Sequence, residues 1–178
     1  LIHKNPGKYS YAHVGRGTIQ HLTMEVFVSA LGAEVVAVPY KGSIQALTDI
    51  IGGQLPMMFD SPGSAASFID NGRVKALTSA SEKRSARLPN VPAVTESGLA
   101  ALDNFRVAGW VGMMAPPQTP KAIVNRLNEE LQKIMLNPDV KQKLFTLGVE
   151  GVGNHTPAKF SEFLRGNMAL WQSAATVA

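Results

Sequence analysis

The stretch Tyr9-Ser10-Tyr11-Ala12-His13-Val14-Gly15-Arg16-Gly17-Thr18 decides the fold of this chain. The short apolar run over 9–14 predicts a strand. Gly15-Arg16-Gly17-Thr18 predicts a tight turn, and the apolar residues after it recur at helical spacing as far as Gly32, where the helix is expected to end. A strand, a glycine turn and a helix in this order indicate an α/β unit.

The same order repeats over the first part of the chain. Further strands are expected over 34–40, 55–59 and 73–79, and further helices over 43–51, capped by Ser43, and 62–70. A β-α-β-α-β-α-β order predicts a mostly parallel α/β sheet. Beyond it we expect a loop with a short helix near 94–101, then a long apolar strand over 105–115 whose Gly109 and Gly112 suit a hinge.

The last part of the chain is predicted to be helical. Thr119-Pro120 and Thr156-Pro157 each place a capping residue before a proline at the first helical position, and a shorter helix is expected over 138–147. The first and last of these helices carry apolar stripes that include Leu127, Leu131, Phe160, Phe163 and Trp171. Such stripes need a partner surface, because exposing them to water is unfavourable.

Composition narrows the function classes. The 178 residues are 45% hydrophobic and 17% charged, which predicts a folded globular chain, and no apolar run is long enough to suggest a transmembrane helix. The chain has no cysteine, so disulfides, thiolate metal sites and cysteine nucleophiles are excluded. The net charge of +4 comes largely from 73–87, a segment with a proline just beyond it and no aromatic residue. This pattern favours a solvated loop over a nucleic-acid-binding face.

Polar groups follow three of the predicted strands where each strand ends. In a parallel sheet these turns lie at one edge, where ligands usually bind. Their hydroxyls, amides and helix N-termini suit a small carboxylate, and Asp60 could accept a hydrogen bond from an amino or hydroxyl group of the ligand. The candidate ligand-binding residues are Gly17, Thr18, His21, Tyr40, Gly42, Ser43, Asp60 and Ser61.

The sequence supports a catalytic site less well than it supports a ligand-binding edge. The four histidines lack zinc spacing, Ser61 and Ser64 lie outside a nucleophile elbow, and Gln20 stands where a dinucleotide-binding fingerprint needs glycine. No catalytic residue, metal or cofactor is therefore expected. The alternative is an α/β enzyme that acts on a small anionic metabolite at the same edge, with His21 or Asp60 as its base.

Many short strings occur in one order along nearly the whole chain. They are Gly15-x-Gly17-Thr18-x-x-His21-Leu22, Val38-Pro39-Tyr40-Lys41-Gly42, Ala46-Leu47-x-Asp49-Ile50-x-Gly52-Gly53-Gln54, Met58-Phe59-Asp60-Ser61, Gly72-Arg73-Val74-Lys75-Ala76-Leu77, Arg84-x-x-x-Leu88-Pro89-Asn90-Val91-Pro92, Glu96-x-Gly98, Trp110-x-Gly112, Ala115-Pro116, Thr119-Pro120-Lys121 and Asn128. This order resembles the TctC or Bug family, the solute receptors of tripartite tricarboxylate transporters.

The resemblance implies a periplasmic binding protein of the type II, Venus-flytrap kind, which captures a small di- or tricarboxylate or an acidic amino acid for membrane transporter subunits. Residues 1–108 resemble the second lobe, and 109–178 resemble the hinge strand and the C-terminal helical part of the first lobe. The N-terminal part of the first lobe has no counterpart. Two outcomes are therefore expected: either a further N-terminal segment supplies the missing sheet, or the helices after 119 pack against another copy, against the second lobe or in a swapped arrangement. The chain has His13 where the family commonly has a small residue. An imidazole facing the ligand would narrow the pocket or add a donor.

Overall fold

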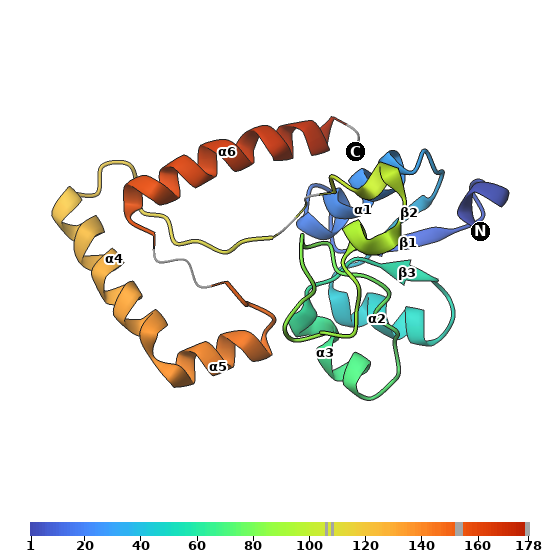
Figure 1. Ribbon diagram of the computed structural model, residues 1–178, viewed down its shortest axis with the longest axis horizontal. Coiled ribbons are helices and arrows are strands. Elements are labelled where there is room, and N and C mark those ends of the chain that lie inside the picture. Colours follow the sequence, from blue (N-terminus) through green and yellow to red (C-terminus); the bar gives the residue numbers. More distant parts are fainter. Residues whose placement is uncertain (106, 108, 152–154, 177–178) are drawn as a thin grey trace.

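The computed structural model describes residues 1–105, 107, 109–151 and 155–176. Its centre is a three-stranded parallel sheet of β1 (Ser10–His13), β2 (Val36–Pro39) and β3 (Met57–Met58), in the order β2-β1-β3 (Figure 1). β1 lies in the middle, and its residue Ala12 pairs with Val38 on one side and Met58 on the other. The predicted parallel sheet is confirmed for these three strands.

Helices cover both faces of the sheet. They are α1 (Ile19–Ala30), α2 (Ser43–Ile51) and α3 (Pro62–Asp70), and the short 3₁₀ helices are η1 (Ile2–Lys4), η2 (Val94–Ser97) and η3 (Ala100–Leu102). The bounds predicted for α2 and α3 are confirmed. Figure 1 shows α1 on one face, with α2 and α3 on the other.

Alternation along β1 divides the core between these two faces, because successive side chains of a strand point to opposite sides. Tyr11 is fully buried and packs with Met24 and Val28 of α1. Ala12, the next residue, is fully buried against Ala46 of α2. The central strand therefore has no solvent-exposed face, as expected for a parallel sheet.

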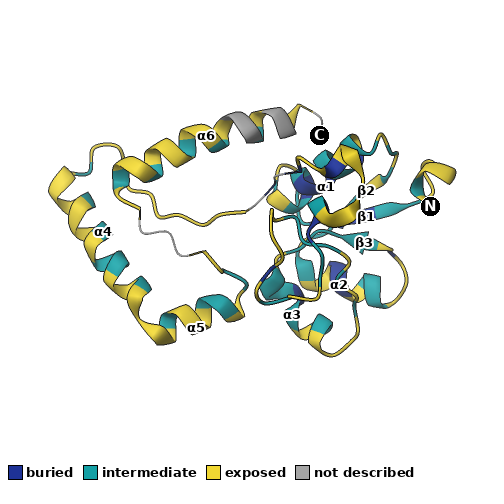
Figure 2. Cartoon of the chain, in the orientation of Figure 1, coloured by how far each residue is buried: buried dark blue, intermediate teal, exposed yellow. Residues whose placement is uncertain are grey.

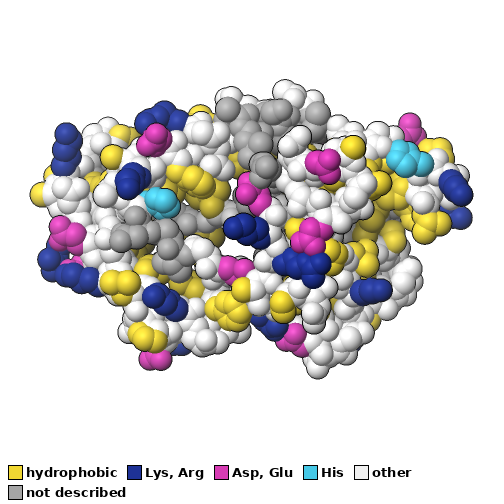
Figure 3. Space-filling model, viewed as in Figure 1, with side chains coloured by type: hydrophobic (Ala, Val, Ile, Leu, Met, Phe, Trp, Pro, Cys, Tyr) yellow, Lys and Arg dark blue, Asp and Glu magenta, His cyan; other side chains and the backbone are white. Residues whose placement is uncertain are grey.

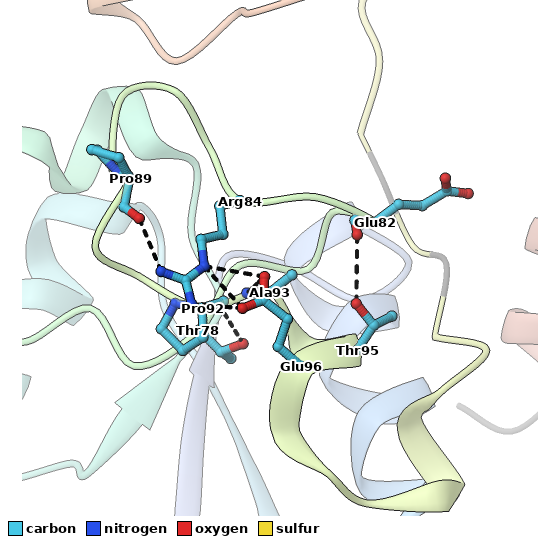
Figure 4. A network of polar contacts seen from close by, with 8 residues as sticks. All are labelled: Thr78, Glu82, Arg84, Pro89, Pro92, Ala93, Thr95 and Glu96. Carbon is cyan, nitrogen blue, oxygen red and sulfur yellow. Dashed lines mark hydrogen bonds and ion pairs between the residues drawn. The ribbon is translucent and has the colours of Figure 1, made fainter.

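The strand predicted over 73–79 is wrong. Only Ser79 takes part in an isolated parallel bridge, and its partner is Ala93. The bridge cannot grow into a ladder, because Pro92 has no N–H to donate and the chain enters η2 at Val94. Side chains stabilise this region instead: Thr78 donates to the Pro92 carbonyl, and the guanidinium of Arg84 donates to Glu96 and to a main-chain carbonyl (Figure 4).

The long strand predicted over 105–115 is also not found in the described residues, and Arg106 and Ala108 lie outside them. Residues 109–115 are extended chain without a neighbouring strand. They are exposed, and the side chain of Val111 is 91% exposed. A strand requires a partner for its N–H and C=O groups, and none of the described segments supplies one.

Two of the predicted helix caps need correction. Gly42 occupies the N-cap of α2, and the Ser43 hydroxyl donates to Asp60 at 2.8 Å instead of capping the helix. The next helix, α4 (Lys121–Leu136), begins after Pro120 without a side-chain cap from Thr119. The Thr156 cap is confirmed, because its hydroxyl oxygen accepts from the Lys159 N–H at 3.3 Å.

The last three helices form an open frame beside the α/β part (Figure 1). They are α4, α5 (Pro138–Thr146) and α6 (Pro157–Ala175). α4 and α5 are described over their whole length and contain no buried residue (Figure 2). α6 contacts α1, and Trp171 packs on the core cluster around Leu102. None of the helices among the described residues is long and apolar enough to cross a membrane.

The basic segment 73–87 is partly neutralised. Arg84 pairs with Glu96, Arg87 pairs with Asp70, and the Arg73 guanidinium lies 5.6 Å from the centroid of the Phe68 ring. On the face shown in Figure 3, lysine and arginine side chains lie among acidic ones and do not form one patch. This distribution agrees with the interpretation as a solvated surface.

Candidate functional site

The carboxyl ends of the three strands lie at one edge of the sheet, because β1 pairs in parallel with both neighbours. The turn after β1 leads into α1, the turn after β2 into α2, and the turn after β3 into α3. Each of these turns carries some of the candidate residues. The arrangement brings three helix N-termini, with their partial positive charge, to the same edge.

The first turn is fastened by its own hydrogen bonds. Gly15 donates its N–H to Nδ1 of His13 at 3.2 Å and accepts at its carbonyl from the Thr18 hydroxyl at 2.7 Å. Thr18 is the N-cap of α1, and its hydroxyl oxygen accepts from the His21 N–H at 3.5 Å. Gly17 has φ +75°, a left-handed conformation that favours glycine, and it is exposed.

The second and third turns are joined through Asp60. One carboxylate oxygen accepts from the Ser43 hydroxyl at 2.8 Å, and the other accepts from the Ser64 hydroxyl at 2.6 Å. Ser61 shares a hydrogen bond with Ser64 at 2.8 Å. Both oxygens of Asp60 therefore have partners within the protein, and its role toward a ligand stays a prediction.

Tyr40 is held away from these turns by α2. Its hydroxyl donates to Oδ2 of Asp49 at 2.8 Å, and this hydrogen bond raises the pKa of Tyr40. The Tyr40 N–H donates to the His13 carbonyl at 2.8 Å and continues the pairing of β1 with β2. The main chain of Tyr40 thus helps to shape the edge, while its hydroxyl group is engaged elsewhere.

His21 lies beneath the first turn. It is 5% exposed, its Nε2 is 3.8 Å from a carboxylate oxygen of Glu25, and its Nδ1 is the buried side-chain atom without a hydrogen-bond partner in the described part of the chain. Burial lowers the pKa of His21, and the neighbouring His13 lowers it further. His13 is itself 3% exposed. The ring of His13 is thus packed inside, where its Nδ1 accepts the Gly15 N–H, and it does not face an open pocket.

An open hollow of about 320 Å³ lies beside the first turn. Of the eight candidate residues it is lined by Gly17 alone, and its other walls are apolar: Ile19, Leu22, Trp110 and Trp171. The two tryptophans are not among the predicted ligand-binding residues. Trp110 belongs to one of the quoted strings and Trp171 to an apolar stripe, but their meeting beside Gly17 depends on the packing of α6 against α1.

The hydrogen bonds divide the eight candidates into two groups. Ser43, Asp60 and Ser61 form one hydrogen-bonded network, flanked by Gly42 and the main chain of Tyr40. The other group comprises Gly17, Thr18 and His21 at the start of α1. In the described residues, no group of three or more histidine and acidic side chains could hold a metal ion.

Parallel strands with their turns at one edge and a flanking helical frame define an α/β protein. The family model described as "Tripartite tricarboxylate transporter family receptor" (TctC) matches residues 1–173. The chain belongs to this family, whose members are solute-binding receptors.

Individual relatives and solved structures are similar to this chain over nearly its whole length. The UPF0065 protein in the tcbD-tcbE intergenic region of Pseudomonas sp. (strain P51) is 37% identical over 169 residues, which are 95% of this chain and 49% of that protein. Among solved structures, R. palustris Rpa4515 with adipate has a TM-score of 0.87 at 27% identity and covers 99% of this chain and 57% of its own. The periplasmic binding protein BugD has a TM-score of 0.84 at 33% identity, and the match covers 98% of this chain and 59% of BugD. MatC from Rhodopseudomonas palustris with bound malate has a TM-score of 0.82 at 26% identity, and the match covers 99% of this chain and 59% of MatC.

The fold is therefore that of periplasmic binding proteins. The chain spans about half the length of the Pseudomonas relative and somewhat more than half of each solved neighbour.

Proposed function

We propose that this chain is part of an extracytoplasmic receptor that captures a small carboxylate in the periplasm and presents it to the membrane subunits of a tripartite tricarboxylate-type transporter. The observation that carries the proposal is the common edge at which α1, α2 and α3 begin. Unpaired amides and the partial positive charge of helix N-termini favour a bound carboxylate.

The chemistry of the edge supports an anionic ligand. Its one acidic side chain among the candidates, Asp60, has both oxygens occupied by serine hydroxyls, which reduces its repulsion of an incoming carboxylate. The hollow beside Gly17 offers apolar walls for the hydrocarbon part of a ligand. Two solved neighbours are described with adipate and with malate, which are both dicarboxylates.

The relatives' lengths support a two-lobed receptor. We assign residues 1–108 to the second lobe, and 109–178 to the hinge segment and the C-terminal helices of the first lobe. Ligand capture would then involve closure of the two lobes about the segment 109–112, a change that a transporter can sense.

A thermal-shift panel tests this function. Adipate, malate, citrate and glutamate are compared with adipamide, the neutral diamide of adipate. A carboxylate at about one hundred times its dissociation constant stabilises the folded state by about 2.7 kcal/mol, so at least one should raise the melting temperature by several degrees. Adipamide should not. An equal rise with adipamide, or none with any carboxylate, would contradict the proposal.

Thr18→Ala is expected to weaken carboxylate binding by about 1 kcal/mol, because the N-cap of α1 and the bond that closes the first turn disappear together. Thr18→Ser keeps the hydroxyl and should bind nearly as well as the wild type. Calorimetry measures the affinities, and unfolding curves verify that both variants are folded. Equal affinities for Thr18→Ala and wild type, at equal stability, would remove Thr18 from the site.

A further inference from the structure

Two buried histidines lie side by side beneath the first turn. His13 is the last residue of β1 and His21 is in the first turn of α1. Their ring centroids are 4.6 Å apart, and the rings meet edge to face at 63°. His13 is not one of the residues proposed to contact the ligand, so its burial at this position points to a different role.

That role follows from the bond to Gly15. Nδ1 of His13 accepts the Gly15 N–H, and the Gly15 carbonyl accepts the Thr18 hydroxyl, so contacts run without a break from β1 to the N-cap of α1. Gly15 itself has φ +141°, a conformation that glycine tolerates and most residues avoid. The shape of the turn thus depends on an acceptor at Nδ1.

A neutral imidazole can accept at Nδ1 only when its proton is on Nε2. A protonated imidazole carries hydrogens on both nitrogens, so its Nδ1–H would face the Gly15 N–H and the hydrogen bond would be lost. We propose that His13 is a positioning residue of the carboxylate site: its neutral Nε2–H form holds the Gly15–Thr18 turn in place, and protonation releases the turn. This inference rests on the proposed function, whose site includes that turn.

Titratable groups near His13 and His21 affect whether either ring is protonated. The neighbouring strands, Val36–Pro39 and Met57–Met58, contribute no titratable side chain within their described residues. On α2 the one acidic side chain, Asp49, accepts from the Tyr40 hydroxyl. At the edge, Asp60 is bonded to Ser43 and Ser64.

The remaining charged groups come from the turn and from α1. Burial lowers the pKa of His21 most, and His13 and Arg16 lower it further, whereas Glu25 raises it by less. Glu25 also accepts from the Tyr11 hydroxyl, so the carboxylate oxygen nearest His21 already has a hydrogen-bond partner.

Nuclear magnetic resonance on the ligand-free protein tests the inference without reference to any ligand. Long-range ¹H–¹⁵N spectra at pH 8 should show His13 as the Nε2–H tautomer. Between pH 8 and 5 the Gly15 amide should shift and exchange faster with solvent. His13→Asn places a non-titrating oxygen near Nδ1 and should abolish this pH response, whereas His3→Asn, the same change at an exposed position, should preserve it. An Nδ1–H tautomer of wild-type His13, or a Gly15 response that persists in His13→Asn, would overturn the proposal.

A second arm connects the turn to binding, with adipate as the probe at pH 7.5 and 5.5. Adipate itself gains protons between pH 7.5 and 5.5, which changes its affinity for every variant. The ratio of its dissociation constants at the two pH values is therefore compared between wild type and His13→Asn, so that this common effect cancels. The ratio should be about tenfold larger for wild type than for His13→Asn. His13→Leu, which lacks an acceptor, should bind weakly at both pH values, and circular dichroism confirms folding. Equal ratios overturn the proposal. If adipate binds no variant, the proposed ligand fails, and the tautomer and the Gly15 response still decide the role of His13.

Discussion

Glu150→Ala is expected to destabilise the fold by about 2 kcal/mol, because three hydrogen bonds to one carboxylate disappear together. Glu150 accepts from the Ser85 hydroxyl, from the Ala86 N–H at 2.8 Å and from the Arg87 N–H at 3.1 Å. Ser85 is 8% exposed, so its hydroxyl would lose its acceptor in a buried place. Glu150 itself is exposed, which keeps the loss well below the sum of three isolated charge-assisted bonds.

These bonds join the segment after α5 to the loop of the α/β part, and a close approach nearby strengthens the junction. A Cβ added to Gly63 would lie 2.7 Å from the Leu147 carbonyl oxygen, so the start of α3 lies directly against the end of α5. Losing the Glu150 carboxylate should therefore loosen the frame of helices as well as lower the global stability. Hydrogen exchange at 85–87 is expected to increase in Glu150→Ala.

The effect should depend on pH. Burial raises the pKa of the Glu150 carboxyl, but the bonds from Ser85, Ala86 and Arg87 outweigh it and bring the pKa below its ordinary value. A lowered pKa in the folded state stabilises the fold above the unfolded value of about 4.3 and stops doing so as the pH falls through the folded value. The free energy of urea unfolding at pH 7 should thus be larger for wild type than for Glu150→Gln, and this difference should shrink as the pH falls below about 4.3 and vanish below the folded pKa. Glu162→Gln on α6 is the matched control; a gap as large for this variant would contradict the assignment.

The second large effect concerns the apolar faces of the frame. Ile123 and Leu127 of α4 are 51% and 45% exposed, and Phe163 and Met168 of α6 are 38% and 59% exposed. Burying such side chains is worth roughly 1.5–3 kcal/mol each, so a set of them left in water favours association. We expect the 178-residue chain on its own to form oligomers in sedimentation experiments, unless further sequence of a longer protein covers these faces.

The variant Ile123→Lys/Leu127→Lys should reduce this association, because it places charges in the middle of the α4 face. Lys121→Ala/Lys133→Ala, on the same helix, is the control and should not. A compact monomer of the wild-type chain that binds carboxylate at full affinity would contradict the prediction.

Elements with local signals were predictable from the sequence. α3 begins at a proline and ends before Asn71-Gly72, and α2 begins after Gly42 and ends before Gly52-Gly53, so their bounds required no knowledge of tertiary contacts. The strands predicted over 73–79 and 105–115 failed for the opposite reason. A strand exists only beside a partner, and the partner of Ser79 is cut short by Pro92, while the described part of 105–115 has none.

For the candidate site, sequence placed the turns but not the directions of their side chains. Parallel order alone implied that the turns share an edge, whereas the engagement of Tyr40 with Asp49 and of Ser43 with Asp60 depends on rotamers. The same holds for His13, whose inward position depends on the alternation of β1. Glu150 was missed because its partners are 63 to 65 residues away and neither segment has a local motif.

The most direct test of the carboxylate site is a residue-resolved titration. Amide shifts of ¹⁵N-labelled protein are followed while the carboxylate that stabilises it most in the thermal-shift panel is added. We expect saturable shifts at Gly17–His21, Gly42–Ser43 and Asp60–Ser61, with little change in α5 and η1. Binding whose shifts avoid all three turns, or no binding by any carboxylate of the panel, would contradict the central claim that this edge of the sheet holds the ligand.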